Sequence, residues 1–180
     1  MTGSAQGRSV AADPADRARE IALRILAGAP KSAAQLRESL LSREVTEAVA
    51  DEVLVRYREV GLLNDEVLAQ TIARTRHLER GQSRRAISHE LRRKGFEPDD
   101  VSSAVAQISD EDERAAALEL AEKRWIALAG VARDARVRRV VAFLGRKGYA
   151  PGVAFDLVKG FERADIWEDR EVDPAEEDVT

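Results

Sequence analysis

Two short segments, Arg93-Lys94-Gly95-Phe96 and Arg146-Lys147-Gly148-Tyr149, decide the fold of this 180-residue chain. Each ends a stretch with two aliphatic residues four positions apart, and a weaker copy of the pattern occurs earlier in the chain. The three copies are Leu36, Leu40, Arg43 and Val45, then Ile87, Leu91, Lys94 and Phe96, and then Val140, Leu144, Lys147 and Tyr149. A recurrence about every 50 residues is typical of stacked supersecondary units, which expose a long surface and offer no deep pocket.

The residues between these copies indicate helices and no strand. Ala, Leu and Val dominate the apolar residues, aromatic residues make up only 4% of the chain, and aliphatic residues recur at helical spacing. Ser32 and Ser83 stand where helix N-caps are expected, and Gly61 and Gly81 where helices are expected to end. We therefore predict an all-α fold, an elongated array of three tandem three-helix repeats. Its predicted parts are a disordered leader at 1–13, repeats at 14–63, 64–109 and 110–161, and an acidic tail at 162–180.

The composition excludes several classes of protein. The chain has no cysteine, which rules out disulfides, zinc–thiolate sites and thiol catalysis. No apolar run approaches the ~20 residues needed to cross a bilayer, and the first residues lack the apolar core of a signal peptide. We expect a cytoplasmic protein, monomeric, with no membrane contact.

No group of residues predicts catalysis, a cofactor or a metal site. His77 and His89 are the only histidines, and without nearby cysteines we expect them at the surface or at helix edges. Paired acids such as Asp99-Asp100 stand at predicted helix starts, where carboxylates interact favourably with the helix dipole. The glycines are isolated and form no phosphate-binding loop. We therefore expect a protein that is not an enzyme and needs no cofactor.

Charge is unevenly distributed along the chain, although the net charge is only −4. Residues 74–94 carry a net charge of +6 and residues 123–147 a net charge of +7, whereas residues 162–180 carry −7. Such asymmetry is informative about partners rather than about fold. The acidic segment has two interpretations: a disordered, solubilising end, or a segment that occupies the basic faces and competes with the partner.

The two basic segments are the predicted partner-binding surface. Ile87 and Leu91 must face inward on one helix, so the arginines beside them project outward, and the same holds one repeat later. Guanidinium groups bind phosphates or carboxylates in bidentate geometry, so the partner is either a DNA backbone or an acidic protein groove. A solvated face balanced by local acids is the alternative. The candidate residues are Arg74, Arg76, Arg80, Arg84, Arg85, Arg92, Arg93, Lys94, Arg136, Arg138, Arg139, Arg146 and Lys147.

Two motifs carry a resemblance to a known family. Gly61-Leu62-Leu63-Asn64-Asp65, followed by Leu68-Ala69, resembles a signature of the RecX regulatory proteins. The pattern Gly81-x-Ser83-x-Arg85-x-Ile87-x-x-Glu90-Leu91-x-x-Lys94-Gly95 is similar to that family's second-repeat motif. The resemblance covers residues 17–161. It departs from the family at Leu68, where an aromatic residue is usual, and at Ser42-Arg43-Glu44-Val45, which replaces an Arg-Gly-aromatic ending.

The resemblance implies a non-enzymatic modulator of the RecA recombinase, active in DNA repair, recombination and the SOS response. Members of the family bind along the groove of the RecA filament on single-stranded DNA and limit recombinase, ATPase and co-protease activities. The partners implied are the RecA filament and, through the basic faces, single- or double-stranded DNA. An elongated array suits this role, because several weak contacts along one rod add up to a firm attachment.

Two functions of other classes compete with this interpretation. A helix-turn-helix transcription factor would need base-reading side chains on a recognition helix. The helices in that position begin with Glu97-Pro98-Asp99-Asp100 and Ala150-Pro151-Gly152, which are acidic or bare and argue against base readout. A helical scaffold that binds acidic proteins without DNA is compatible with the charge pattern, so both alternatives are tested by comparing binding to naked and RecA-coated DNA.

Overall fold

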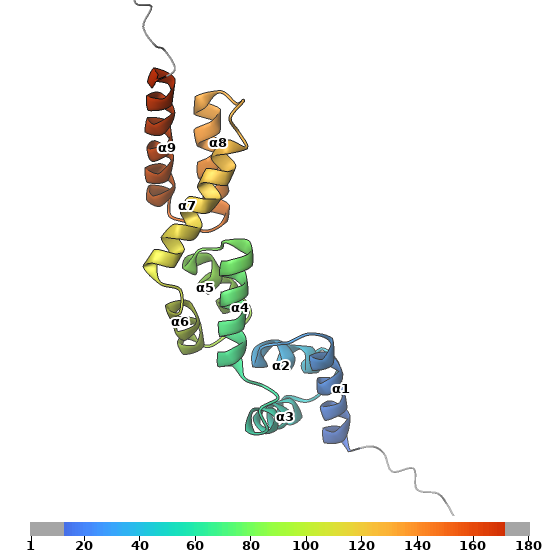
Figure 1. The fold of residues 1–180 in the computed structure, drawn as a ribbon. Coiled ribbons are helices and arrows are strands. Elements are labelled where there is room, and N and C mark those ends of the chain that lie inside the picture. The colour runs from blue at the N-terminus through green and yellow to red at the C-terminus, as the bar shows by residue number, and fades with distance from the viewer. Residues whose placement is uncertain (1–12, 172–180) are drawn as a thin grey trace, which may run out of the picture.

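The computed structural model describes residues 13–171, with side chains described for residues 13–163. This part of the chain forms nine helices and no strand, which confirms the predicted all-α fold. The helices are α1 (Pro14–Gly28), α2 (Ala33–Leu41), α3 (Glu47–Glu59), α4 (Asp65–Arg80), α5 (Arg84–Arg93), α6 (Pro98–Ala106), α7 (Asp110–Ile126), α8 (Arg133–Arg146) and α9 (Pro151–Glu171). They form three consecutive groups along a rod, with α1 near one end and α9 at the other (Figure 1).

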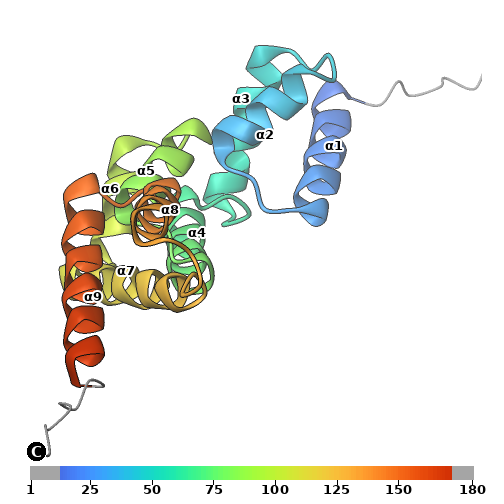
Figure 2. The ribbon, with the colours of Figure 1, turned by 90° about the horizontal axis from the view of Figure 1, so that it is seen from above.

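Each group of three helices has a hydrophobic core of its own. The core of repeat one includes Leu36 and Leu40, and the cores of repeats two and three include Ile87 and Val140 at the equivalent position. None of the three described clusters contains a buried residue from another repeat. The array is therefore three small cores in series rather than one continuous core. Seen from above, repeat one lies to one side of repeats two and three, which overlap in this view (Figure 2).

Small residues on the first helix of each repeat let the other two helices approach closely. Ala22, Ala73 and Ala121 are buried at 0–1% exposure on α1, α4 and α7. Alanine also has the highest helix propensity, so these positions favour the helix and its packing together. Larger aliphatic residues and a few buried aromatic residues, Tyr57, Phe96, Trp125 and Tyr149, fill the rest of the three cores.

The repeats are joined by hydrogen bonds at the start of each second helix. Ser32, the N-cap of α2, donates its Oγ proton to the Lys94 carbonyl at 2.6 Å. One repeat later the backbone N–H of Ser83, the N-cap of α5, donates to the Lys147 carbonyl at 3.0 Å. The Lys-Gly turn at the end of α5 therefore docks on the N-terminus of α2, and the Lys-Gly turn at the end of α8 docks on the N-terminus of α5.

A carboxylate from the following repeat completes each joint. Asp65 Oδ1 accepts the N–H of Ala33 at 3.0 Å, and Glu113 Oε1 accepts the N–H of Arg84 at 2.7 Å. Ala33 and Arg84 are the first residues of α2 and α5, where backbone N–H groups have no partner within the helix. At both joints a carboxylate of the following repeat thus accepts the first backbone N–H of the second helix, so the two joints are built in the same way.

Glycine is required in the two docked turns and not in the first copy. Gly95 and Gly148 have φ of +77° and +94°, and an added Cβ would lie 2.5 Å from Ala34 Cβ and 2.4 Å from Ser83 Oγ respectively. Glu44 occupies the corresponding place in repeat one with φ of 64°. Among the described residues this turn docks on no other second helix, so a side chain is tolerated there.

The structure extends the last helix beyond the predicted end of repeat three. We predicted an end at Phe161, but α9 continues to Glu171, because no glycine or proline interrupts this stretch. The predicted leader, apart from Asp13, and residues 172–180 of the acidic tail lie outside the described residues, as do the tail's side chains beyond Arg163. Within the part that is described, no helix is long and apolar enough to span a membrane.

Candidate partner-binding surface

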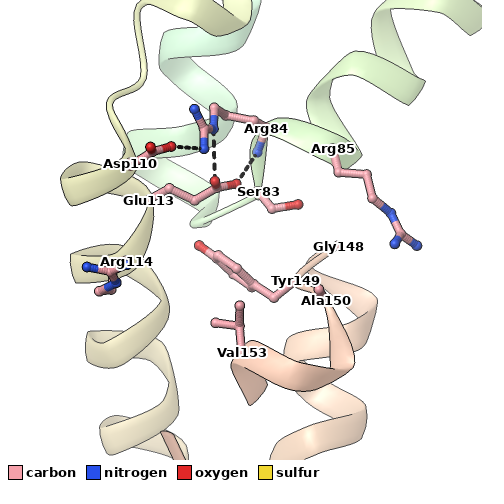
Figure 3. Close-up of a pocket in the computed structure, with 10 residues that line it drawn as sticks. All are labelled: Ser83, Arg84, Arg85, Asp110, Glu113, Arg114, Gly148, Tyr149, Ala150 and Val153. Atoms are coloured by element: carbon pink, nitrogen blue, oxygen red, sulfur yellow. Dashed lines mark hydrogen bonds and ion pairs between the residues drawn. The ribbon is translucent and has the colours of Figure 1, made fainter. Parts of the chain in front are cut away.

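Arg84, one of the predicted partner-binding residues, is held in the joint between repeats two and three. Its Nε donates to Glu113 Oε2 at 2.8 Å, and its Nη2 pairs with Asp110 (Figure 3). The hydrogen bonds to Asp110 and Glu113 raise the pKa of Arg84 above its ordinary value. Since both acceptors lie on α7, this guanidinium ties α5 to the following repeat.

Arg76 and Lys94 converge on a single carboxylate inside repeat two. Arg76 binds Glu90 in bidentate fashion, with the closest contact at 2.9 Å, and the side chains are only 21% and 15% exposed. Lys94 Nζ lies 3.5 Å from the same carboxylate. The Arg76 guanidinium holds the pKa of Glu90 below its ordinary value, against the opposing effect of burial. These charges link α4 to α5 and are largely neutralised.

Two further predicted residues have structural contacts in repeat three. Lys147 Nζ donates to the Arg80 carbonyl at 2.6 Å across the joint. The Arg136 guanidinium lies 3.8 Å from the centre of the Trp125 ring, and its Nε donates to the Trp125 carbonyl at 3.0 Å. Both cations therefore hold the fold together at these points.

The eight remaining predicted residues are exposed arginines, which we call the arginine surface. Its members are Arg74, Arg80, Arg85, Arg92, Arg93, Arg138, Arg139 and Arg146. Their guanidinium groups have no ion-pair partner among residues 13–163. Exposed, uncompensated guanidiniums of this kind can bind phosphates or carboxylates without breaking an internal contact first.

Four members of the arginine surface recur at equivalent positions of repeats two and three. Arg85 precedes the first Lys-Gly turn by as many residues as Arg138 precedes the second. Arg93 and Arg146 correspond in the same way, each directly before its own Lys-Gly turn. Repeat one has Ala34 and Ser42 at these positions. The arginine surface is thus confined to repeats two and three, a restriction that the charge counts already indicated.

The sequence did not single out Arg114, an exposed cation that lines a cavity in the structure. It lies on α7, just after four consecutive acids at Asp110–Glu113, and so falls outside both basic segments. The structure brings it to a cavity that Arg85 also lines. No sequence signal pairs two residues on different repeats in this way, since it depends on the joint.

Histidine and carboxylate positions give no sign of a metal site in the described part of the chain. No cluster of three potential ligands occurs there. We expected both histidines at the surface or at helix edges. His77 lies in the last turn of α4, where it is only 7% exposed, with Nδ1 3.2 Å from the Gln82 carbonyl. Its burial follows from its position in the last turn of α4, which the start of the next repeat covers.

Comparison with known proteins identifies each repeat separately. Residues 18–56, 64–105 and 110–158 match the first, second and third three-helix domains of RecX. The chain belongs to the RecX family. RecX-family members are non-enzymatic regulatory proteins of the recombination and repair system, which confirms both the suspected family and the expectation that the chain is not an enzyme.

Several RecX proteins are similar to this chain over most of their length. The Regulatory protein RecX of Streptomyces coelicolor is 44% identical over 147 residues, which cover 82% of this chain and 78% of that protein. The Regulatory protein RecX of Thermobifida fusca is 40% identical over 157 residues, covering 87% and 85%. The crystal structure of RecX from Lactobacillus salivarius shares the fold with a TM-score of 0.73, at 18% identity, over 84% of this chain and 98% of that one.

Proposed function

We propose that this RecX-family chain binds the RecA filament on single-stranded DNA along its groove and inhibits recombinase, ATPase and co-protease activities. The observation that carries the proposal is the arginine surface, which leaves eight guanidiniums uncompensated on two consecutive repeats of a regulatory family's array. Phosphates of the filament's DNA and carboxylates of its protein groove are both suitable ligands. We further propose that the protein acts as a cytoplasmic monomer.

The shape of the molecule supports binding along a groove. Three separate cores in series make a rod, and a rod can contact neighbouring subunits of a filament at several points (Figure 1). Once one repeat is bound, the next is held at high effective concentration near its own contact. Weak charged contacts that are worth about 0–1 kcal/mol each can then sum to a stable attachment.

The test is ATP turnover by RecA on single-stranded DNA with substoichiometric amounts of this protein. We expect inhibition by the wild type and a loss of inhibition when Arg85, Arg92 and Arg93 are all changed to glutamate. Arg84 is left unchanged, because a glutamate there would face Glu113 and Asp110 in the joint. Circular dichroism should show unchanged helix content, since all three substituted residues are exposed.

A matched control reverses the same charge on repeat one. Arg17, Arg56 and Arg58 are exposed arginines there, and their change to glutamate alters the net charge equally. We expect this variant to inhibit nearly as well as the wild type. Equal loss in both variants would mean that net charge, and not the arginine surface, controls binding.

Binding to different nucleic acids distinguishes the regulator from its competitors. We expect preference for RecA-coated single strands over naked single strands and duplex, with affinity falling as salt rises. A transcription factor would prefer one duplex sequence. A scaffold that binds acidic proteins without DNA would bind neither naked single strands nor duplex.

A further inference from the structure

A cavity of about 390 Å³ lies at the joint between repeats two and three. Its walls come from the start of α5, the start of α7 and the turn that leads from α8 into α9. Figure 3 shows these three segments around the Tyr149 side chain. The cavity exists only because the Lys-Gly turn of repeat three docks on α5, so it is a product of the joint.

The charge inside this cavity is positive and uneven. Arg84 is compensated by Asp110 and Glu113, whereas Arg85 and Arg114 line the same cavity with no ion-pair partner among residues 13–163. In Figure 3 the two uncompensated guanidiniums lie on opposite sides of Tyr149, and no dashed line reaches either of them. Two cations separated by a cavity suit a ligand with two separated negative groups.

The surface between the two cations is neutral and partly apolar. Val153 lines the cavity and is 41% exposed, which is high for a large aliphatic side chain. Burial, with a smaller contribution from Glu113, raises the pKa of Tyr149 to about 12, so its phenol stays neutral. The phenol already donates to the Gly81 carbonyl at 3.2 Å. Since Tyr149 is only 5% exposed, the carbon that a ligand meets between the guanidiniums comes mainly from Val153.

We infer that this cavity binds an acidic segment of a protein partner, with an aliphatic residue against Val153 and carboxylates on Arg85 and Arg114. A nucleic acid fits less well, because α7 opens with four consecutive acids. Asp110 lines the cavity with a side chain that is 83% exposed, and Glu111 is exposed beside it. A continuous phosphate chain would have to pass these carboxylates, whereas a peptide can place its two charges selectively. The inference goes beyond RecA inhibition and stands without it.

The test measures binding of a short fluorescein-labelled peptide of alternating glutamate and leucine to the full chain at low ionic strength. A peptide with glutamine in place of glutamate is the ligand control. We expect the double variant Arg85→Ala and Arg114→Ala to weaken binding about tenfold, since each exposed charged contact contributes up to about 1 kcal/mol. Val153→Glu should weaken binding similarly, because it places a carboxylate between the two cations.

The matched control is the double variant Arg138→Ala and Arg139→Ala, which removes the same charge from the arginine surface outside the cavity. We expect its peptide affinity to stay within about twofold of the wild type. Equal weakening by both double variants, binding of the glutamine peptide as tight as that of the glutamate peptide, or no peptide binding at all would each overturn the inference. The inference would also be overturned if a single-stranded oligonucleotide bound in place of the peptide and its binding were lost in the Arg114→Ala variant.

Discussion

The substitution Gly148→Ala tests whether the Lys-Gly turn is a tight joint between repeats. Gly148 has φ of +94°, and a Cβ at this position would lie 2.4 Å from Ser83 Oγ and 2.5 Å from Ala86 Cβ. Both neighbours belong to the start of α5 in the preceding repeat. Alanine would therefore be strained by its backbone conformation and would also push repeat three away from repeat two.

The expected loss in the free energy of unfolding is the sum of the backbone strain and the clash with α5. A non-glycine residue in a left-handed conformation costs about 1–2 kcal/mol, of which about 0.4–1 kcal/mol is offset by the lower entropy of the unfolded chain. Forcing an extra methyl group into a filled space adds about 1–3 kcal/mol. We expect Gly148→Ala to lower the free energy of unfolding by about 2–4 kcal/mol.

Gly61→Ala is the matched control, because it separates the two effects. Gly61 has a similar φ of +73°, but an added Cβ would have no heavy atom within 4 Å. Only the conformational cost applies there, so we expect a loss of about 1 kcal/mol or less. Urea denaturation followed by far-ultraviolet circular dichroism measures both variants, with fits that allow each repeat its own transition. Equal losses in the two variants would refute the reasoning, because the joint would then tolerate a methyl group.

Three further predictions concern single side chains. Glu44→Gly should raise the melting temperature by relieving strain of up to about 1 kcal/mol, because Glu44 has φ of 64°; an unchanged or lower melting temperature would contradict this. Arg84→Ala should lower the free energy of unfolding by about 1–3 kcal/mol in urea denaturation, since it removes a charged hydrogen bond to Glu113. The same substitution at the exposed Arg85 should have little effect on stability, and an equal loss in both variants would contradict this. Glu90 has a pKa below its ordinary 4.5 because of Arg76, so its stabilisation is complete above pH 4.5 and is lost as the pH falls through the folded-state pKa. Glu90→Gln should therefore lower stability at neutral pH and flatten its dependence on acid, and a variant as acid-sensitive as the wild type would contradict the assignment.

The sequence predicted the helices and their grouping well because these depend on local spacing. The pair Leu36 and Leu40 and its later copies mark the buried face of each second helix, and all six residues are buried in the structure. Ser32 and Ser83 were predicted as N-caps, and both are. Their second role, in the joints between repeats, has no local signature.

The candidate site was predicted less well than the fold. Charge counts identified two basic segments, but they did not separate Arg84, which bonds to Glu113, from its neighbour Arg85, which is exposed. The segment counts also passed over Arg114, because it follows a run of acids. Net charge per segment ignores where the neutralising groups lie, so it overestimates how many cations are available.

The sequence by itself determined that this chain is a series of three three-helix units, because aliphatic spacing, N-cap serines and terminal glycines act within a few residues of one another. Only the tertiary structure decided which arginines remain exposed and where a cavity forms. Some of the deciding contacts join different repeats: the Glu113 carboxylate reaches Arg84 across 29 positions of sequence, and Lys147 reaches the Arg80 carbonyl across 67. Contacts at such separations depend on how the repeats dock, and no local pattern records them.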